Sequence, residues 1–315
     1  MSDTKSKLLQ IPVIRNVVVF LSKIKLPGLE GLSFYDLLEL YIIGIVKGAL
    51  TTRASAIAFS FFMAIFPFLL FILIIIPYVP IEDFQTDFLA FLESFLPPKT
   101  SDFFHDSIFN NIKSSGLISS VFLISLFLMA NGVNAVFSGF ENSYHEELSR
   151  NVFRQYLYAL MVAVVLSFLL LFTVAGLAYF EIYILDTSAD ALQNLGFKKE
   201  DSIGFLADAS KYLFFVIMIY LATATLYYFG TPARKVSKFR SIGALFTTLL
   251  IMLNSYLFGI YINNFSKYNE LYGSIGALLI LMVYLWLNSN IILLGYELNS
   301  ALRKLKSLNI KNDES

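Results

Sequence analysis

The sequence contains no cysteine, and this absence excludes disulfides, thiol catalysis and cysteine-based metal sites. Its two histidines, His105 and His145, are too few for a histidine-rich metal site. It also has no glycine-rich phosphate loop, no pair of histidines four residues apart and no Gly-x-Ser-x-Gly nucleophile elbow. We therefore expect no metal and no cofactor, and none of the common nucleotide-dependent or hydrolytic chemistries.

Charge is also scarce, because Asp, Glu, Lys and Arg make up 15% of the residues, against about 25% in soluble domains. Hydrophobic residues reach 57% and are concentrated in six long stretches. As a helix, each stretch is long enough to cross the roughly 30 Å hydrocarbon core of a bilayer. The predicted spans cover about 54–78, 117–139, 152–185, 209–230, 240–263 and 271–302. The predicted fold class is therefore an all-α polytopic membrane protein with one six-span domain over 54–302.

The few charges are sorted between alternate loops. Of the 23 Lys and Arg residues, 17 lie in the N-terminal segment up to Arg53, in the loop near 140–154, in the loop 231–240, or in the tail from Arg303. Basic loops face the cytoplasm by the positive-inside rule, so we expect both termini to be cytoplasmic. The segment 1–53 then forms a cytoplasmic N-terminal region, and 303–315 forms a cytoplasmic tail.

Three amphipathic segments outside the spans are predicted to lie at the membrane surface. Residues 34–50 follow the capping-box spacing of Ser33 and Asp36 and carry one apolar face, which predicts an in-plane helix on the cytoplasmic side. Residues 81–96 and 101–113 place Phe and Ile at helical spacing. We expect both as helices on the outer surface or dipping into the outer leaflet. The simpler interpretation is that they only cover the bundle.

Two charged residues stand at the same predicted depth in different spans. Arg53 precedes the first span, and Glu297 lies near the end of the last one. We predict an ion pair between them that holds these two spans together. The alternative for Arg53 is a side chain that extends to the lipid headgroups. Pro67 lies near the middle of the first span, lacks a backbone N–H and is predicted to kink that helix.

The second span carries a polar stripe on one helical face, toward its cytoplasmic end. The stripe consists of Asn131, Asn134, Ser138, Glu141 and Asn142. It either lines a hydrated cavity or bonds to neighbouring helices, and single interhelical hydrogen bonds contribute only about 0.6 kcal/mol on average. On the last span, Asn290 shares a face with Glu297, and Asn299 follows two residues later. A groove between the second and last spans is the arrangement that would favour a transport function.

The most distinctive motifs fall at these same places. They are Arg53-Ala54-Ser55-Ala56-Ile57-Ala58-Phe59 with Phe66-Pro67, Leu96-Pro97-Pro98, the region around Asn142, Tyr272-Gly273-Ser274-Ile275-Gly276-Ala277 and Leu294-Gly295-Tyr296-Glu297-Leu298-Asn299. Over about 35–305 the chain resembles the YihY/BrkB family of bacterial inner-membrane proteins, once labelled ribonuclease BN. The resemblance implies six spans in the bacterial cytoplasmic (inner) membrane, with both termini cytoplasmic. It also implies a role in the cell envelope, such as export or flipping of lipid-linked or lipopolysaccharide-type material.

Three functions remain open from the sequence. The first is a transporter or flippase-like protein for an amphipathic lipid-linked or envelope molecule, with membrane lipids and not nucleic acid as partners. The second is a non-transporting scaffold or assembly factor, in which the asparagines of the second span are packed and dry. The third is a membrane-embedded hydrolase that would use the cluster of Glu141, His145, Glu146 and Glu147. A solvated helix end explains that cluster more simply, so we expect no enzyme and no ribonuclease. The oligomeric state is left open.

Overall fold

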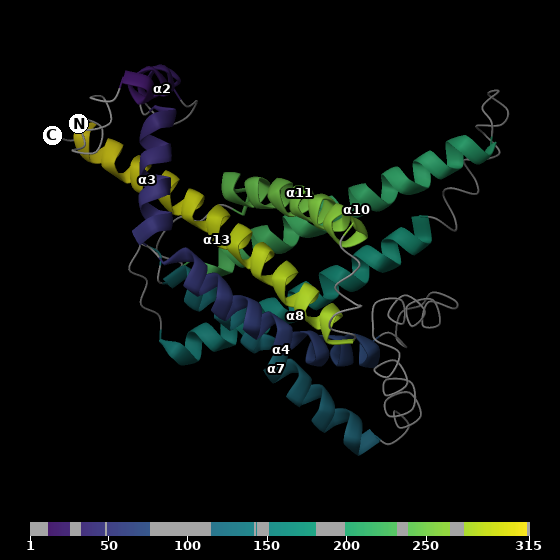
Figure 1. Cartoon of the computed structure of the whole chain (residues 1–315). Coiled ribbons are helices and arrows are strands. Elements are labelled where there is room, and N and C mark those ends of the chain that lie inside the picture. Colours follow the sequence, from purple (N-terminus) through teal and green to yellow (C-terminus); the bar gives the residue numbers. More distant parts are fainter. Residues whose placement is uncertain are drawn as a thin grey trace.

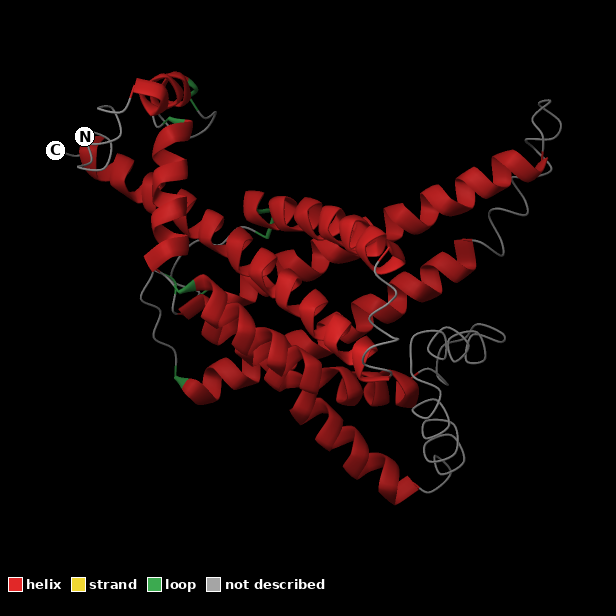
Figure 2. Ribbon diagram, viewed as in Figure 1, coloured by secondary structure: helices red, strands yellow, loops and turns green. Residues whose placement is uncertain are grey.

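The computed structural model describes residues 12–25, 33–47, 49–75, 115–141, 143, 151–180, 199–231, 239–264 and 274–313. These residues are almost entirely helical, and Figure 2 shows no strand among them. The all-α fold class predicted from the sequence is therefore confirmed. The predicted outer helices 81–96 and 101–113, together with Asn142 and both histidines, lie outside the described residues.

Within the described ranges, six helices are long and apolar enough to cross a membrane, as the six apolar stretches predict. They are α4 (Leu50–Ile75), α7 (Ser115–Glu141), α8 (Val152–Tyr179), α10 (Lys199–Gly230), α11 (Ile242–Asn264) and α13 (Ser274–Asp313). Helices are the form that such apolar segments can take in lipid, because a helix pairs its own backbone N–H and C=O groups. The last helix, α13, has 40 residues and is therefore about 60 Å long, roughly twice the hydrocarbon thickness.

The six helices pack in chain order, and the last returns to the first. Each contacts the next along the chain, and α13 packs on α4, so the spanning helices form a closed ring. Successive helices run in opposite directions, so α4, α8 and α11 begin at the end of the ring where α7 and α10 stop (Figure 1). We call this end the Arg53 end. Figure 1 shows the helices close together there, on the left of the view, and diverging toward the opposite end.

Two shorter helices, α2 (Pro12–Lys23) and α3 (Phe34–Lys47), lie at the Arg53 end (Figure 1). The predicted capping box of α3 is present, because Ser33 N donates to Asp36 Oδ2 at 2.9 Å and Asp36 N donates to Ser33 Oγ at 3.3 Å. The helix stops at Lys47, three residues before the predicted end. Ala49, with a φ of 45°, then turns the chain into α4. In Figure 1, α3 lies across the direction of the spanning helices. Its predicted place in the plane of the membrane surface stays a prediction.

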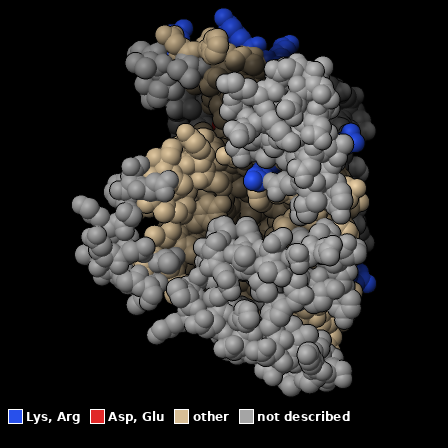
Figure 3. Space-filling view, turned by 90° about the vertical axis from the view of Figure 1, so that its right-hand side faces the viewer, with Lys and Arg blue, Asp and Glu red and all other residues tan. Residues whose placement is uncertain are grey.

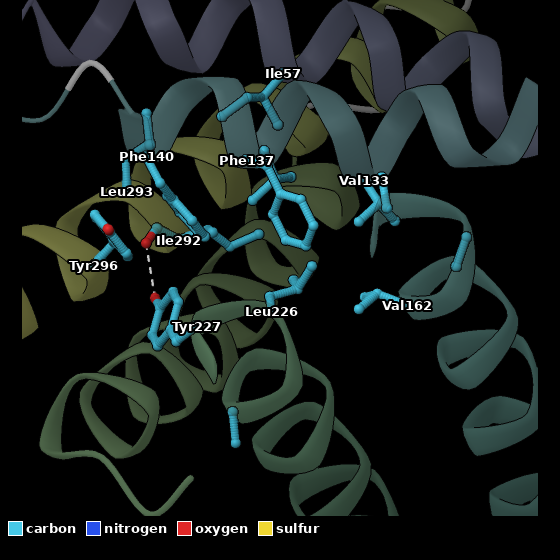
Figure 4. Close-up of a cluster of buried hydrophobic side chains, with 14 of the residues drawn as sticks. Ile57, Val133, Phe137, Phe140, Val162, Leu226, Tyr227, Ile292, Leu293 and Tyr296 are labelled. Carbon is cyan, nitrogen blue, oxygen red and sulfur yellow. Dashed lines mark hydrogen bonds between the residues drawn. The ribbon is translucent and has the colours of Figure 1, made fainter. Parts of the chain in front are cut away.

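An aromatic cluster forms the centre of the core near the Arg53 end. Phe140 of α7 stacks on Tyr296 of α13, with ring centroids 3.9 Å apart and planes inclined by 3°. Tyr227 of α10 meets both rings edge-on, at 5.7 and 6.0 Å. Figure 4 shows its hydroxyl donating to the Ile292 carbonyl oxygen, at 2.7 Å. Edge-to-face and stacked ring pairs contribute stability beyond that of the apolar area they bury. The cluster therefore holds α7, α10 and α13 together.

Two glycines allow α11 and α13 to cross closely beside this cluster. A Cβ atom at Gly295 would collide with Thr247 Oγ1 and would lie 2.5 Å from the Tyr227 hydroxyl. A Cβ atom at Gly243 would collide with the Gly295 carbonyl oxygen. The absence of side chains at both positions therefore lets the two backbones approach, as small residues do at helix contacts in membranes.

The outward faces of the spanning helices are apolar. On α11 the large exposed side chains include Leu245, Leu249, Leu253, Tyr256 and Leu257. Figure 3 views the molecule from the end opposite Arg53. The described atoms visible there are mostly uncharged, with a few Lys and Arg side chains and no visible Asp or Glu. The exposed apolar side chains on α11 suit contact with hydrocarbon, where charged side chains are costly.

Candidate functional site

Arg53 and Glu297 meet where α13 closes the ring onto α4. Arg53 Nη2 lies 2.8 Å from Glu297 Oε1, and the two side chains are 9% and 0% exposed. The ion pair predicted from the sequence is thus present in the structure, and Arg53 does not extend to the headgroups. Ser143 Oγ donates to the other carboxylate oxygen, Glu297 Oε2, at 2.8 Å. Each oxygen of the buried carboxylate therefore has a partner, which offsets the penalty of taking a charge out of water.

Arg53 also binds the end of α7. Its Nη1 donates to the Gly139 carbonyl oxygen at 2.7 Å. This carbonyl belongs to the last turn of α7, where carbonyls lack a partner in their own helix and carry the negative end of the helix dipole. The approach is close, because a Cβ atom at Gly139 would lie 2.8 Å from Ile57 Cδ1. One guanidinium group thus joins α4, α7 and α13.

Helix α3 also lies near this site, because it packs on α13. Its Tyr41 ring meets Phe246 of α11 edge-on, with centroids 6.4 Å apart. Burial, and then the negative charge of Glu297, raises the pKa of the Tyr41 hydroxyl. Helix α3 therefore lies close enough to the site for the Glu297 charge to act on Tyr41.

The polar stripe of α7 divides into two parts, and the part nearer the Arg53 end bonds to α8. When its nitrogen faces the carboxylate, the buried Gln155 amide donates to Glu141 Oε1 at 2.6 Å and accepts from Ser138 Oγ at 3.0 Å. The Asn134 side-chain oxygen position lies 3.2 Å from the same amide. Ser138 and Glu141 therefore hold α7 to α8, which is the helix-bonding alternative for the stripe.

The other part of the stripe lines a hollow of about 380 Å³ between α4 and α7. We call it the mid-span hollow, and it is lined by Phe59, Ser60, Met63, Leu128, Asn131, Asn134 and Ala135. Phe59 is two residues, or about 200° of helix, from buried Ile57, and Asn131 stands in the same relation to buried Val133. The hollow therefore faces outward from the ring. Ser60 and Asn131 fall near the middle of the spans Leu50–Ile72 and Phe122–Glu141.

Among the stripe residues that the structure describes, Asn131 has the most exposed side chain. Its side chain is exposed and makes no hydrogen bond within the described part of the chain. Transfer of an amide into hydrocarbon without a hydrogen-bond partner costs roughly 4–8 kcal/mol. An outward-facing asparagine at this depth therefore indicates that polar groups, such as water or a headgroup, fill the hollow. This agrees with the hydrated-cavity interpretation for this part of the stripe.

The second and last spans do not enclose a groove at the Arg53 end. There the stacked rings of Phe140 and Tyr296 fill the contact between α7 and α13. The hollow lies instead between the first and second spans, and nearer the membrane centre than the stripe as a whole suggests. The reason is rotational, because the face of α7 that carries Asn131 points away from α13 and toward lipid.

The remaining predicted residues act within helix packing. The Asn290 amide nitrogen donates to the Trp286 carbonyl oxygen of its own helix at 2.8 Å, so this amide bonds within α13 and not to the Glu297 site. Asn299 Oδ1 accepts from Gly243 N at 2.8 Å and thereby caps the first turn of α11. Helix α4 continues through Pro67, which is buried.

Three contributors to these contacts were not identified from the sequence. The Gly139 carbonyl is a backbone group, so no residue type marks it. Ser143 adjoins the motif region around Asn142 and could have been found there. Gln155 carried the clearest signal, as a lone amide near the start of a very apolar span. Among the described residues, no group of three or more His, Asp or Glu side chains could hold a metal ion.

Comparison with known proteins places this arrangement in a family. The Virulence factor BrkB family matches residues 44–314 of the chain. The chain belongs to the BrkB family. With six apolar helices of spanning length, this BrkB-family chain is an integral, multi-pass membrane protein.

Relatives of known sequence cover most of the BrkB-family chain. A ribonuclease-like protein of Bacillus subtilis (strain 168), YfkH, is 26% identical over 266 residues, which is 83% of this chain and 93% of the relative. A UPF0761 membrane protein of Aggregatibacter aphrophilus (strain NJ8700) is 25% identical over 273 residues, which is 85% of this chain and 92% of the relative. No solved structure matches the chain.

Proposed function

We propose that this BrkB-family protein moves an amphipathic lipid-linked or envelope molecule across the membrane. In this proposal the polar headgroup passes over the outer face of α4 and α7, and the acyl tails stay in lipid. The observation that carries the proposal is the mid-span hollow, where Asn131, Asn134 and Ser60 offer hydrogen bonds near the centre of the spans. A polar hollow at this depth lowers the barrier that a headgroup meets in hydrocarbon.

The polar groups also extend from the hollow toward one end of the ring. Asn134 lines the hollow and lies beside Gln155, which in turn contacts Ser138 and Glu141. These groups cover the half of the span between the hollow and the Arg53 end. Because the basic loops predict that this end is cytoplasmic, the proposal has the substrate enter from the cytoplasmic leaflet.

The Arg53 contacts supply a fixed support for this path. Arg53 holds α4 to the last turn of α7 and to Glu297 of α13, and it is buried. Its two Nη atoms are thus engaged within the protein, so we assign Arg53 to positioning α4 against α7 and not to substrate binding. The sequence has no glycine-rich phosphate loop, so the proposal relies on a gradient or on downhill flux.

Lipid movement in reconstituted vesicles tests the proposal. We expect vesicles containing the wild-type protein to expose headgroup-labelled fluorescent lipids to external dithionite faster than protein-free vesicles do. The double variant Asn131→Leu with Asn134→Leu should lose this acceleration. The matched control is Asn290→Leu, which removes an amide whose bond is to its own helix and should keep the activity. Absence of movement for every lipid and lipid-linked sugar tried would count against transport.

A scaffold without transport is the second candidate, and the Gln155 contacts favour it. Here the stripe of α7 would serve only to hold helices together, as Ser138 and Glu141 already do. Single cysteines at positions 131 and 138 separate the two functions, because the native chain has none. The transport proposal expects a small water-soluble maleimide to modify position 131 faster than position 138. Equal protection of both positions would favour the scaffold.

A further inference from the structure

We propose that the mid-span hollow binds an uncharged, polyhydroxylated headgroup, such as a glycosyl group, in preference to an anionic one. This inference rests on the proposed function, because it names the substrate class for the same hollow. Its basis is the chemistry of the described lining residues, which offer hydrogen-bond donors and acceptors and carry no charge.

The polar part of the lining consists of two amides and one hydroxyl. Asn131 and Asn134 each carry an amide with a carbonyl oxygen and an NH₂ group, and Ser60 carries a hydroxyl. One end of the Asn134 amide also lies beside Gln155. Each of these side chains both donates and accepts hydrogen bonds. The hydroxyl groups of a sugar do the same, so neighbouring hydroxyls on one ring can satisfy an amide at both its oxygen and its nitrogen. A phosphate group has only acceptors and would leave the amide oxygens without a donor.

The apolar part of the lining suits the remaining surface of a sugar. Phe59 is 56% exposed and offers a flat apolar ring at the rim, and Met63 is 55% exposed beside it. The C–H face of a sugar ring can pack on such a surface. The volume of about 380 Å³ lies at the lower end of the range for small-ligand pockets, about 300–1,000 Å³, so it fits a headgroup but not the tails.

Among the residues that the structure describes, no charged side chain lines the hollow. Arg53 precedes Ser60 by seven residues, about 10 Å along α4, and is bound to Glu297 and Gly139. Glu141 follows Asn134 by the same spacing and is bound to Gln155. An anionic headgroup at this depth would therefore lie in a low-dielectric region without a counter-charge, which strongly disfavours it.

Photolabelling in nanodiscs tests this preference at the hollow itself. The probe is a glucosyl-diacylglycerol with a diazirine close to the glycerol, in a phosphatidylcholine bilayer, and cross-linked peptides are mapped by mass spectrometry. We expect adducts on α4 and α7 around residues 59–63 and 128–135. Unlabelled glucosyl-diacylglycerol should compete at about tenfold lower mole fraction than phosphatidylglycerol. Since one ordinary hydrogen bond changes binding about fivefold, loss of both amides in Asn131→Leu with Asn134→Leu should abolish the preference.

The controls separate this inference from the proposed function. Asn290→Leu should keep both the adducts and the preference, and Asn131→Ser, a milder change, should reduce the preference if the double variant does not fold. Equal competition by the two lipids, stronger competition by phosphatidylglycerol, or no adducts at these peptides would overturn the inference. If labelled lipids still move across vesicles in any of those cases, the proposed function stands without it. If the sugar preference is found but nothing moves, the hollow is a lipid-binding site and transport is refuted.

Discussion

Removing one charge of the Arg53–Glu297 pair tests whether a single buried contact closes the ring. The side chains are 9% and 0% exposed, so the surviving charge could not reach water without moving a helix. Loss of one partner from a buried pair typically costs about 3–5 kcal/mol, because the other charge stays buried and unpaired. We expect Arg53→Met near the upper value, since it also removes the bond to the Gly139 carbonyl. Glu297→Gln should fall near the lower value, because an amide oxygen can still accept from Arg53.

Double variants separate the charge pairing from the capping of α7. Arg53→Met combined with Glu297→Gln leaves no unpaired charge, so its loss of stability should be well below the sum of the two single losses. The exchange of Arg53→Glu with Glu297→Arg restores the attraction between the positions. However, it also places a carboxylate against the Gly139 carbonyl, at the negative end of the α7 dipole. We therefore expect the exchanged pair to recover only part of the lost stability.

Unfolding by SDS in mixed micelles provides the measurement. The fluorescence of Trp286, the one tryptophan of the chain, reports on the core because this residue packs against it. Arg154→Met is the matched control, since Arg154 is an exposed arginine on α8 and its loss should change the free energy of unfolding by less than about 0.5 kcal/mol. If Arg53→Met is no more destabilising than Arg154→Met, or if the two single losses simply add, the ring-closing role is refuted.

Three further predictions use the same unfolding assay. Gly295→Ala should lower the free energy of unfolding by at least about 1–3 kcal/mol, because its Cβ would collide with Thr247 Oγ1. Its control, Gly259→Ala, should be neutral or stabilising, because nothing lies within 4 Å of that Cβ position. Equal effects of the two changes would contradict the close crossing of α11 and α13. Ala49→Gly should raise stability by up to about 1 kcal/mol, because glycine adopts a φ of 45° without strain, and a loss of stability would argue against this conformation. Tyr41→Phe should flatten the loss of stability at alkaline pH. The folded-state pKa of Tyr41 is raised above its unfolded value of about 10, so the stability that its protonated hydroxyl contributes is complete below that pH and is lost as the pH rises through the folded pKa. If the difference in stability between wild type and Tyr41→Phe does not change between about pH 9 and pH 11, this prediction is wrong.

Length and hydrophobicity were enough to place all six spanning helices, because a helix is the structure in which one long apolar segment pairs all its own backbone groups. The capping box of α3 was equally local, since it depends on two residues three apart. The Arg53–Glu297 contact was within reach for a different reason. Charges are so rare in the spans that two opposite ones at the same depth have few other partners.

The fold class and one long-range contact could therefore be predicted from the residues alone. The rotation of each helix about its axis, and the neighbours it meets, follow only from the packing of the whole ring. That rotation divides the α7 stripe, so that Ser138 and Glu141 face Gln155 while Asn131 faces outward beside Ser60. Helical periodicity places residues on a common face but does not say what the face contacts, because in lipid the polar and apolar sides are not sorted by water. The hollow between α4 and α7 follows from that packing and has no signature in either helix alone.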